Sequence, residues 1–129
     1  MKKILLIDDS LFHLTVAEDI LKNKYEITTA KSAKEALGYL SNKRLVPNLI
    51  ILDILMPDID GWETYNLIKG ISLLRDVPIA FLTSLDGDAE KDEAAKLGAA
   101  DFITKPFEEG ELIKRIEAII GKHEAKDDS

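Results

Sequence analysis

Three continuous apolar runs lie along the chain, at residues 4–7, 49–52 and 79–82, and a polar residue follows each of them. Runs without alternation are typical of strands that are buried on both faces. Such strands occur in parallel sheets, because crossover helices cover both sides of the sheet. The chain is therefore expected to fold around a central parallel sheet.

Two further segments, residues 25–29 and 101–104, mix polar and apolar residues and are predicted to be strands as well. Stretches with apolar residues at helical spacing lie between the strands and are predicted to be amphipathic helices. The chain thus alternates five strands with five helices. The apolar positions of the five expected helices are, in chain order, Leu14, Ala17 and Leu21; Ala33, Ala36, Leu37 and Leu40; Trp62, Tyr65 and Ile68; Ala94, Ala95 and Leu97, in a polar stretch over 86–97; and Leu112, Ile113, Ile116, Ile119 and Ile120.

The burial of the strands predicts their order in the sheet. The first, third and fourth strands are continuously apolar and belong in the middle, whereas the mixed second and fifth strands belong at the edges. This pattern predicts an α/β fold of the flavodoxin-like, doubly wound type, with the order 2-1-3-4-5 and right-handed crossovers.

The ends of the helices and of the domain also carry signals. Ser10 or Asp9 is expected to cap the first helix and Ser32 the second, while Gly98 is expected to end the fourth. A length of 129 residues fits one domain, expected over residues 1–121. Residues 122–129 are expected to form a polar, frayed tail.

The composition excludes several classes of function. The chain has no cysteine and only two histidines, far apart in sequence, which argues against disulfides, thiolate sites and a histidine-based zinc site. Its formal net charge of −7 provides no long-range attraction to nucleic acid or to an anionic membrane. The first apolar run is too short for a signal peptide or a membrane span, so a cytoplasmic protein is expected.

Polar residues gather where the predicted strands end. Asp8 and Asp9 follow the first strand, Asp53 the third, Thr83 the fourth and Lys105 the fifth. The carboxyl ends of parallel strands meet at one edge of a sheet, where ligands bind. Each residue also has a purely structural explanation, such as a helix cap or a loop charge. A charge directly after four buried residues is nevertheless costly unless it is compensated, so a shared site is favoured.

This set of residues suits phosphoryl transfer. Clustered carboxylates repel one another, and Mg²⁺ relieves that repulsion by binding their oxygens together with water and phosphate oxygens. A lysine and a hydroxyl would add a positive charge and a hydrogen-bond donor for a phosphoryl group. A carboxylate can itself be the nucleophile and form an aspartyl phosphate. A dinucleotide site is disfavoured, because no glycine-rich loop follows the first strand.

The motifs, taken together, resemble those of response-regulator receiver domains, the phosphorylation switches of two-component signalling. The resemblance runs from about Lys2 to Gly121, with every motif in order. The motifs are Asp8-Asp9-Ser10, the stretch from Asp53 through Met56-Pro57 to Asp60-Gly61, Thr83-Ser84 and Lys105-Pro106-Phe107.

The resemblance implies a role for each site residue. Asp53 would accept a phosphoryl group from a histidine kinase, a phosphotransfer protein or a small phosphodonor. The roles of the other residues would be as follows: Mg²⁺ held by Asp9, Asp53 and the carbonyl of Leu55, with Asp8 acting partly through water; the phosphoryl group bound by Lys105, Thr83 and Ser84; a cis peptide between Lys105 and Pro106; and Phe102 as the switch aromatic that moves inward.

The same resemblance implies what the switch does. The surface formed by the helix over 86–97, the strand over 101–104 and the last helix would change and control a downstream effector protein. Such a domain is not a turnover enzyme. Leu55 and Leu85 are apolar at the positions that tune self-dephosphorylation in this family, so a long-lived phosphoryl group is expected.

Two other functions remain as alternatives. A Mg²⁺-dependent phosphatase would need an acid two residues beyond Asp53 and a lid domain, and the chain has Leu55 there and no length for a lid. A pseudo-receiver, which never binds phosphate, would lack Asp9, Asp53 or Lys105, and none of them is lost. His13, on the first helix, could lie near the mouth of the site, but a surface histidine is the favoured expectation.

Overall fold

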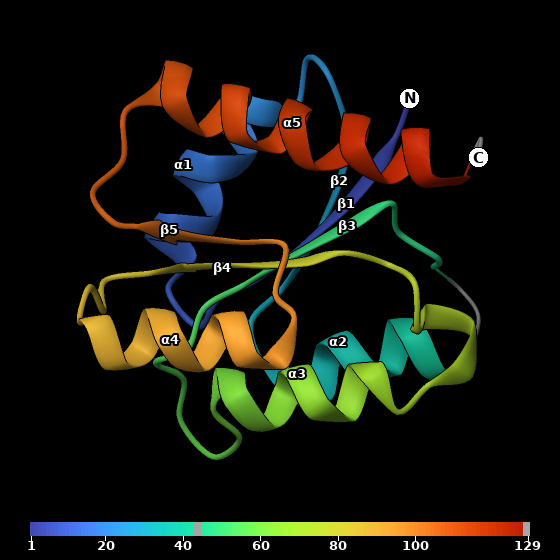
Figure 1. Ribbon diagram of the computed structural model, residues 1–129, viewed down its shortest axis with the longest axis vertical. Coiled ribbons are helices and arrows are strands. Elements are labelled where there is room, and N and C mark those ends of the chain that lie inside the picture. Colours follow the sequence, from blue (N-terminus) through green and yellow to red (C-terminus); the bar gives the residue numbers. More distant parts are fainter. Residues whose placement is uncertain (43–44, 128–129) are drawn as a thin grey trace.

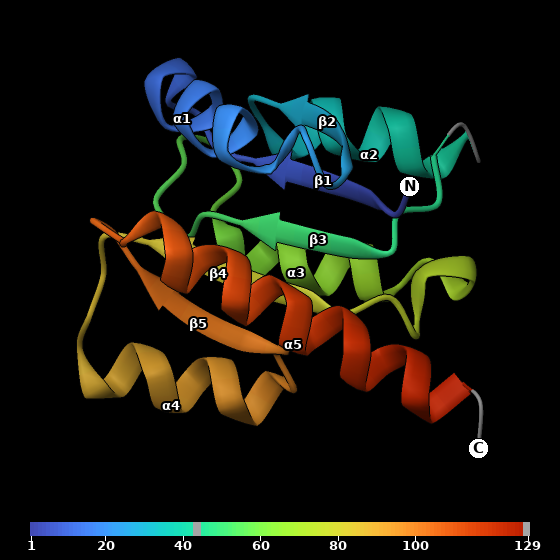
Figure 2. The same cartoon turned by 90° about the horizontal axis from the view of Figure 1, so that it is seen from above.

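The computed structural model describes residues 1–42 and 45–127. Its centre is a parallel sheet of five strands in the order β2-β1-β3-β4-β5, seen in Figure 2. The predicted flavodoxin-like arrangement is confirmed. The strands are β1 (Lys3–Ile7), β2 (Glu26–Ala30), β3 (Leu49–Leu52), β4 (Ile79–Thr83) and β5 (Asp101–Thr104).

Helices cover both faces of the sheet, as Figure 1 shows. On one face lie α1 (Leu11–Leu21) and α5 (Glu109–Asp127). On the other lie α2 (Ala33–Ser41), α3 (Gly61–Lys69) and α4 (Asp88–Leu97), with a short 3₁₀ turn, η1 (Ser72–Leu74), after α3. The result is a three-layer domain.

The two cores follow from the alternation of side chains along the central strands. In β1, Leu5 and Ile7 pack towards α2 and α3, whereas Ile4 and Leu6 pack towards α1 and α5. Every residue of β3 and β4 is buried, whereas β2 and β5 are partly exposed at the edges. Burying each large apolar side chain contributes roughly 1.5–3 kcal/mol, so this double-sided burial fixes the order of the strands.

The register of the sheet brings the strand ends level with one another. Ile7 pairs with Leu52, and Thr83 pairs with Thr104. The amide of Asp53 donates to the carbonyl of Ile7 at 2.9 Å, and the amide of Lys105 donates to the carbonyl of Thr83 at 2.8 Å. The polar residues that follow the strands therefore start from one edge of the sheet.

Side-chain caps and one glycine set the helix ends. The Ser10 and Ser32 hydroxyls accept hydrogen bonds from the third residue of their helices, and the Asp60 carboxylate does the same for α3. Gly98 ends α4 with a left-handed φ of 90°, a conformation that glycine adopts without a steric cost. The caps at Ser32 and Gly98 were predicted, and Ser10 rather than Asp9 caps α1.

Two helix boundaries differ from the sequence expectation. Helix α4 begins at Asp88, after the N-cap Gly87, and not at residue 86. Helix α5 continues to Asp127, so residues 122–127 are helical and not a frayed tail, while residues 128 and 129 lie outside the described residues. An ion pair of 2.6 Å between Lys2 and Glu124 links this last part of α5 to the start of the chain.

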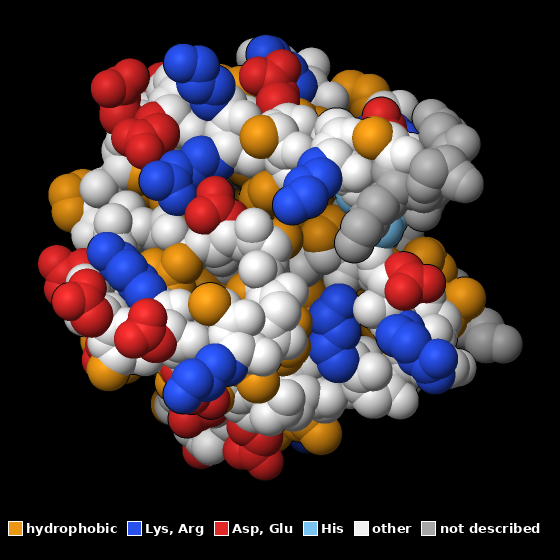
Figure 3. All heavy atoms as spheres, viewed as in Figure 1, with side chains coloured by type: hydrophobic (Ala, Val, Ile, Leu, Met, Phe, Trp, Pro, Cys, Tyr) orange, Lys and Arg blue, Asp and Glu red, His pale blue; other side chains and the backbone are white. Residues whose placement is uncertain are grey.

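Most charged side chains of the sequence lie at the surface, with both signs mixed. On the face seen in Figure 3, lysine and arginine side chains are interspersed with aspartate and glutamate side chains. Within residues 1–42 and 45–127, no helix combines the length and the apolar character that a membrane crossing requires.

Candidate functional site

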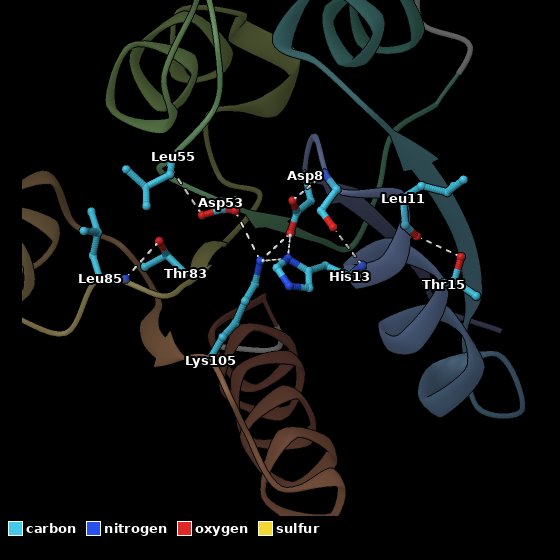
Figure 4. A network of polar contacts seen from close by, with 10 residues as sticks. Asp8, Leu11, His13, Thr15, Asp53, Leu55, Thr83, Leu85 and Lys105 are labelled. Atoms are coloured by element: carbon cyan, nitrogen blue, oxygen red, sulfur yellow. Dashed lines mark hydrogen bonds and ion pairs between the residues drawn. The ribbon is translucent and has the colours of Figure 1, made fainter.

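Asp53 lies at the end of the central strand β3, and its residue is only 7% exposed. Two backbone hydrogen bonds position this residue. Its amide donates to the carbonyl of Ile7 in β1, and one carboxylate oxygen, Oδ1, accepts a hydrogen bond of 3.2 Å from the amide of Leu55. The second oxygen, Oδ2, faces Lys105 (Figure 4). A buried carboxylate with one oxygen directed at a cation is suited to chemistry at that oxygen.

Asp8 follows β1 and is also 7% exposed. Burial raises the pKa of its carboxyl above the usual value, because the charged form loses water. Hydrogen bonds from Lys105 and from the Ser10 amide oppose this rise. The two buried carboxylates, Asp8 and Asp53, therefore need a nearby positive charge.

Lys105 supplies that charge. It follows β5, and its ammonium Nζ lies 2.5 Å from Asp8 Oδ2 and 3.2 Å from Asp53 Oδ2. All three side chains are 10% exposed or less. The Lys105–Pro106 peptide is cis, as the resemblance implied. The ammonium thus bridges the carboxylates from two neighbouring strands, as Figure 4 shows.

Thr83 is the last residue of β4 and is fully buried, and its hydroxyl Oγ1 accepts a hydrogen bond of 3.4 Å from the amide of Leu85. Ser84 is exposed beside it. Phe102, in β5, is half-buried, with its ring 6.3 Å from the ring of Phe81 between centroids. Thr83 and Phe102 thus lie on neighbouring strands, and Phe81, two residues before Thr83 in β4, neighbours the Phe102 ring.

The loop after Asp53 passes close to the start of α3. A Cβ at Gly61 would lie 2.4 Å from the carbonyl oxygen of Asp53 and 2.5 Å from the Cα of Ile54. These distances leave no room for any side chain at this position. The Gly61 amide also donates to the carbonyl of Ile54 at 2.8 Å. Glycine at position 61 therefore lets α3 support the backbone of Asp53 directly.

The structure brings most, but not all, of the expected site residues together. Asp8, Asp53 and Lys105 meet, with Thr83 on the adjacent strand. Asp9 is exposed, and it is not part of the group of metal-ligating side chains that Asp8 and Asp53 form. His13 joins that group instead: one ligand atom from each of the three side chains lies within 4.8 Å of the others.

His13 is exposed, as expected of a surface histidine, and its imidazole also reaches the mouth of the site. Its side chain is 43% exposed, but Nδ1 lies 2.8 Å from Lys105 Nζ and 3.6 Å from Asp8 Oδ2. Its spacing of five residues from Asp8 was the available signal, because the first turn of a helix that follows a strand end faces the same edge of the sheet.

The donor set could hold a divalent cation. Two carboxylates at a partly open edge match the ligands of Mg²⁺, which takes one or two carboxylates and keeps several waters. Leu55 is 51% exposed, so the loop beside Asp53 is open to solvent. A hard divalent cation and a phosphoryl group would both fit the charge of this edge, the cation on the carboxylates and the phosphoryl group near Lys105.

Comparison with known proteins identifies relatives over nearly the whole chain. A family model described as the response regulator receiver domain matches residues 4–117. Protein PilG of Pseudomonas aeruginosa is 36% identical over 117 residues, which cover 90% of this chain and 85% of that protein. The alkaline phosphatase synthesis transcriptional regulatory protein PhoP of Bacillus subtilis is 34% identical over 95% of this chain and 50% of its own length.

Solved structures agree with the sequence relatives. The chemotaxis protein CheY4 of Vibrio cholerae superposes with a TM-score of 0.85 at 29% identity, over 92% of this chain and 98% of that one. The chain spans about half the length of PhoP and 26% of the length of PleD of Caulobacter vibrioides.

Proposed function

The chain belongs to the family of response regulator receiver domains, and on that basis we propose that it is a phosphorylation switch with Asp53 as the phosphoryl acceptor. Receiver domains are signalling domains that interact with histidine kinases and with downstream effectors. We infer that this chain receives its phosphoryl group from a histidine kinase or a phosphotransfer protein.

The observation that carries the proposal is the environment of the Asp53 carboxylate. Oδ2 of Asp53 is directed at the Lys105 ammonium, and Oδ1 accepts from a backbone amide. In the transfer, one carboxylate oxygen forms a bond to phosphorus while the bond from phosphorus to the donor breaks, and the donor keeps the electron pair. Lys105 then donates to the phosphoryl oxygens, and the Thr83 hydroxyl and the Ser84 amide add further donors.

The carboxylates supply the metal site that this step would use. Mg²⁺, when bound, neutralises negative charge on the phosphoryl oxygens. Asp8, Asp9, Asp53 and the carbonyl of Leu55 are the proposed ligands. Asp8 and Asp53 already meet across β1 and β3, whereas Asp9 would have to turn towards them. Lys105 would leave the carboxylates as the cation binds and would then be available to the phosphoryl group.

The proposed output is a change of the surface formed by α4, β5 and α5. Thr83 ends β4, and β4 pairs with β5 at Thr104. A shift of Thr83 towards the phosphoryl group would leave room for Phe102 to move inward. This movement would alter the surface that a downstream effector binds. A pseudo-receiver that never takes up phosphate is the alternative, and it is disfavoured because Asp9, Asp53 and Lys105 are all retained.

Incubation with acetyl phosphate and Mg²⁺, followed by intact mass measurement, tests the proposal. One added phosphoryl group is expected, and it should be absent with Asp53→Asn or with excess chelator. Asp58→Asn is the matched control, because Asp58 lies in the same loop, is exposed and has a left-handed φ of 67° that asparagine tolerates. A chain that takes up no phosphoryl group in Mg²⁺, or takes it up equally with Asp53→Asn, would refute the proposal.

A further inference from the structure

His13 lies at the edge of the proposed metal site, and the proposed function assigns it no role. It is the third residue of α1, and its amide donates to the Ser10 hydroxyl that caps the helix at 3.2 Å. The cap fixes the first turn of α1 beside Asp8. The imidazole therefore reaches the site from the side opposite to Asp53 along the sheet edge, as Figure 4 shows.

Three ligand atoms converge on one positive charge. The Lys105 ammonium lies 2.5 Å from Asp8 Oδ2, 2.8 Å from His13 Nδ1 and 3.2 Å from Asp53 Oδ2. One ligand atom from each of Asp8, His13 and Asp53 lies within 4.8 Å of the other two. A cation therefore already occupies the point at which these three side chains meet.

The contact with Lys105 requires one tautomer of the imidazole. An ammonium group only donates hydrogen bonds, so at 2.8 Å His13 Nδ1 accepts and carries its lone pair towards the shared point. In that tautomer the ring proton of neutral His13 is on Nε2. A lone pair aimed at a cation position is what a metal-ligating histidine requires.

We propose that His13 Nδ1, with Asp8 and Asp53, forms a three-ligand site for a divalent transition ion such as Co²⁺, Ni²⁺ or Zn²⁺, which takes the place of the Lys105 ammonium. The inference builds on the proposed function, because the ion occupies the same carboxylates that would hold Mg²⁺. Imidazole suits these ions, whereas Mg²⁺ prefers oxygen ligands. His13 therefore gives the site a preference among divalent ions that two carboxylates alone would provide only weakly.

Calorimetric titration of the full chain with Co²⁺ and, separately, with Mg²⁺ tests the inference. For the His13→Asn variant, the ratio of Co²⁺ affinity to Mg²⁺ affinity is expected to fall by about tenfold or more, the lower end of what disturbing a metal site costs. His123→Asn is the matched control, because His123 is the other histidine of the chain and lies on α5. It should leave the ratio unchanged.

A spectroscopic measurement separates ligation from an indirect effect. Co²⁺ should shift and broaden the imidazole proton resonances of His13, and Asp53→Asn should weaken that effect. Because the His13 side chain is 43% exposed, its replacement is compatible with folding, and circular dichroism checks this.

Different outcomes test the role of His13 and the proposed function. An unchanged affinity ratio in His13→Asn, an equal loss in His123→Asn, or no measurable Co²⁺ binding by the unaltered chain would each overturn the role of His13. None of these results bears on acetyl phosphate labelling of the unaltered chain in Mg²⁺, which tests the proposed function. Failure of that labelling, with Co²⁺ still bound through His13, would refute the switch and leave the metal site standing.

Discussion

Replacing Lys105 with methionine should destabilise the metal-free protein strongly, and Mg²⁺ should reverse part of the loss. Methionine keeps most of the length of the side chain but removes the only positively charged group that lies within 3.2 Å of both buried carboxylates among the described residues. Asp8 and Asp53 then face each other at an edge where each is 7% exposed. The expected effect is a lower free energy of unfolding in chelator.

The magnitude follows from the two ion pairs. At an effective dielectric constant of about 20, two unit charges about 4 Å apart attract by about 4 kcal/mol, and both pairs here are shorter. Desolvation offsets much of that attraction, and removing one partner of a buried pair costs about 3–5 kcal/mol in practice. We expect a loss of about 3 kcal/mol, or roughly 10 °C in Tm for a domain of this size.

Mg²⁺ should help the variant more than the unaltered protein. In the unaltered protein the cation has to displace the ammonium, whereas in Lys105→Met the carboxylates are free to bind it. A ligand present at about a hundredfold over its Kd stabilises a protein by about 2.7 kcal/mol. The difference in free energy of unfolding between the two proteins should therefore be smaller in Mg²⁺ than in chelator.

Urea unfolding followed by circular dichroism, in chelator and in Mg²⁺, measures both effects. Lys34→Met, on the exposed face of α2, is the matched control and should stay within about 0.5 kcal/mol of the unaltered protein. The reasoning is refuted if Lys105→Met is as stable as the unaltered protein in chelator, or if Mg²⁺ stabilises the unaltered protein more than the variant.

Three other predictions concern the lifetime of the phosphoryl group, the pH dependence and the backbone. The phosphorylated protein should persist for much longer than seconds at neutral pH, because neither Leu55 nor Leu85 can hold an attacking water; decay within seconds, followed by intact mass, would contradict this. The pKa of Asp8 is raised in the folded state, so ionisation of its carboxyl costs stability as the pH rises above the usual pKa of an aspartate. In chelator, Asp8→Asn should therefore gain stability relative to the unaltered protein between about pH 4 and pH 7. If the free energies of unfolding of the two proteins, from urea unfolding, change with pH in the same way, the prediction is wrong. Gly98→Ala should lower the free energy of unfolding by about 1 kcal/mol because of the left-handed φ of residue 98. Gly38→Ala lies inside α2, where an added Cβ would meet no atom beyond the local helix backbone within 4 Å, and it should raise the free energy of unfolding by roughly 0.5–1 kcal/mol. Thermal melts of the two variants test both signs.

The sheet and most of the site could be predicted from the sequence because both depend on simple periodicities. Continuous apolar runs mark strands that are buried on two faces, and parallel strands deliver whatever follows them to one edge. Asp8, Asp53 and Lys105 meet there for that reason alone. Their convergence needs no knowledge of how any helix is rotated.

The contact of His13 depends on a detail that the sequence left open. Ser10 and Asp9 were both acceptable caps for α1, and a shift of one residue turns a helix by about 100° relative to its start. Because Ser10 is the cap, His13 faces Lys105. The extent of α5 was missed for a different reason. Its last residues are polar and carry no apolar periodicity, and Glu124 contacts Lys2, which is distant in sequence.

The packing around Phe81 gives the chain an optical reporter of its own. Trp62, the sole tryptophan, lies edge-on to the Phe81 ring, with the centroids 5.0 Å apart. Phe81 is two residues before Thr83 in β4, and its ring also neighbours Phe102. Indole emission responds to changes in the groups around the ring. Movement at the end of β4 can therefore be followed as a change in the intrinsic fluorescence of the unlabelled protein, in real time and without an attached dye.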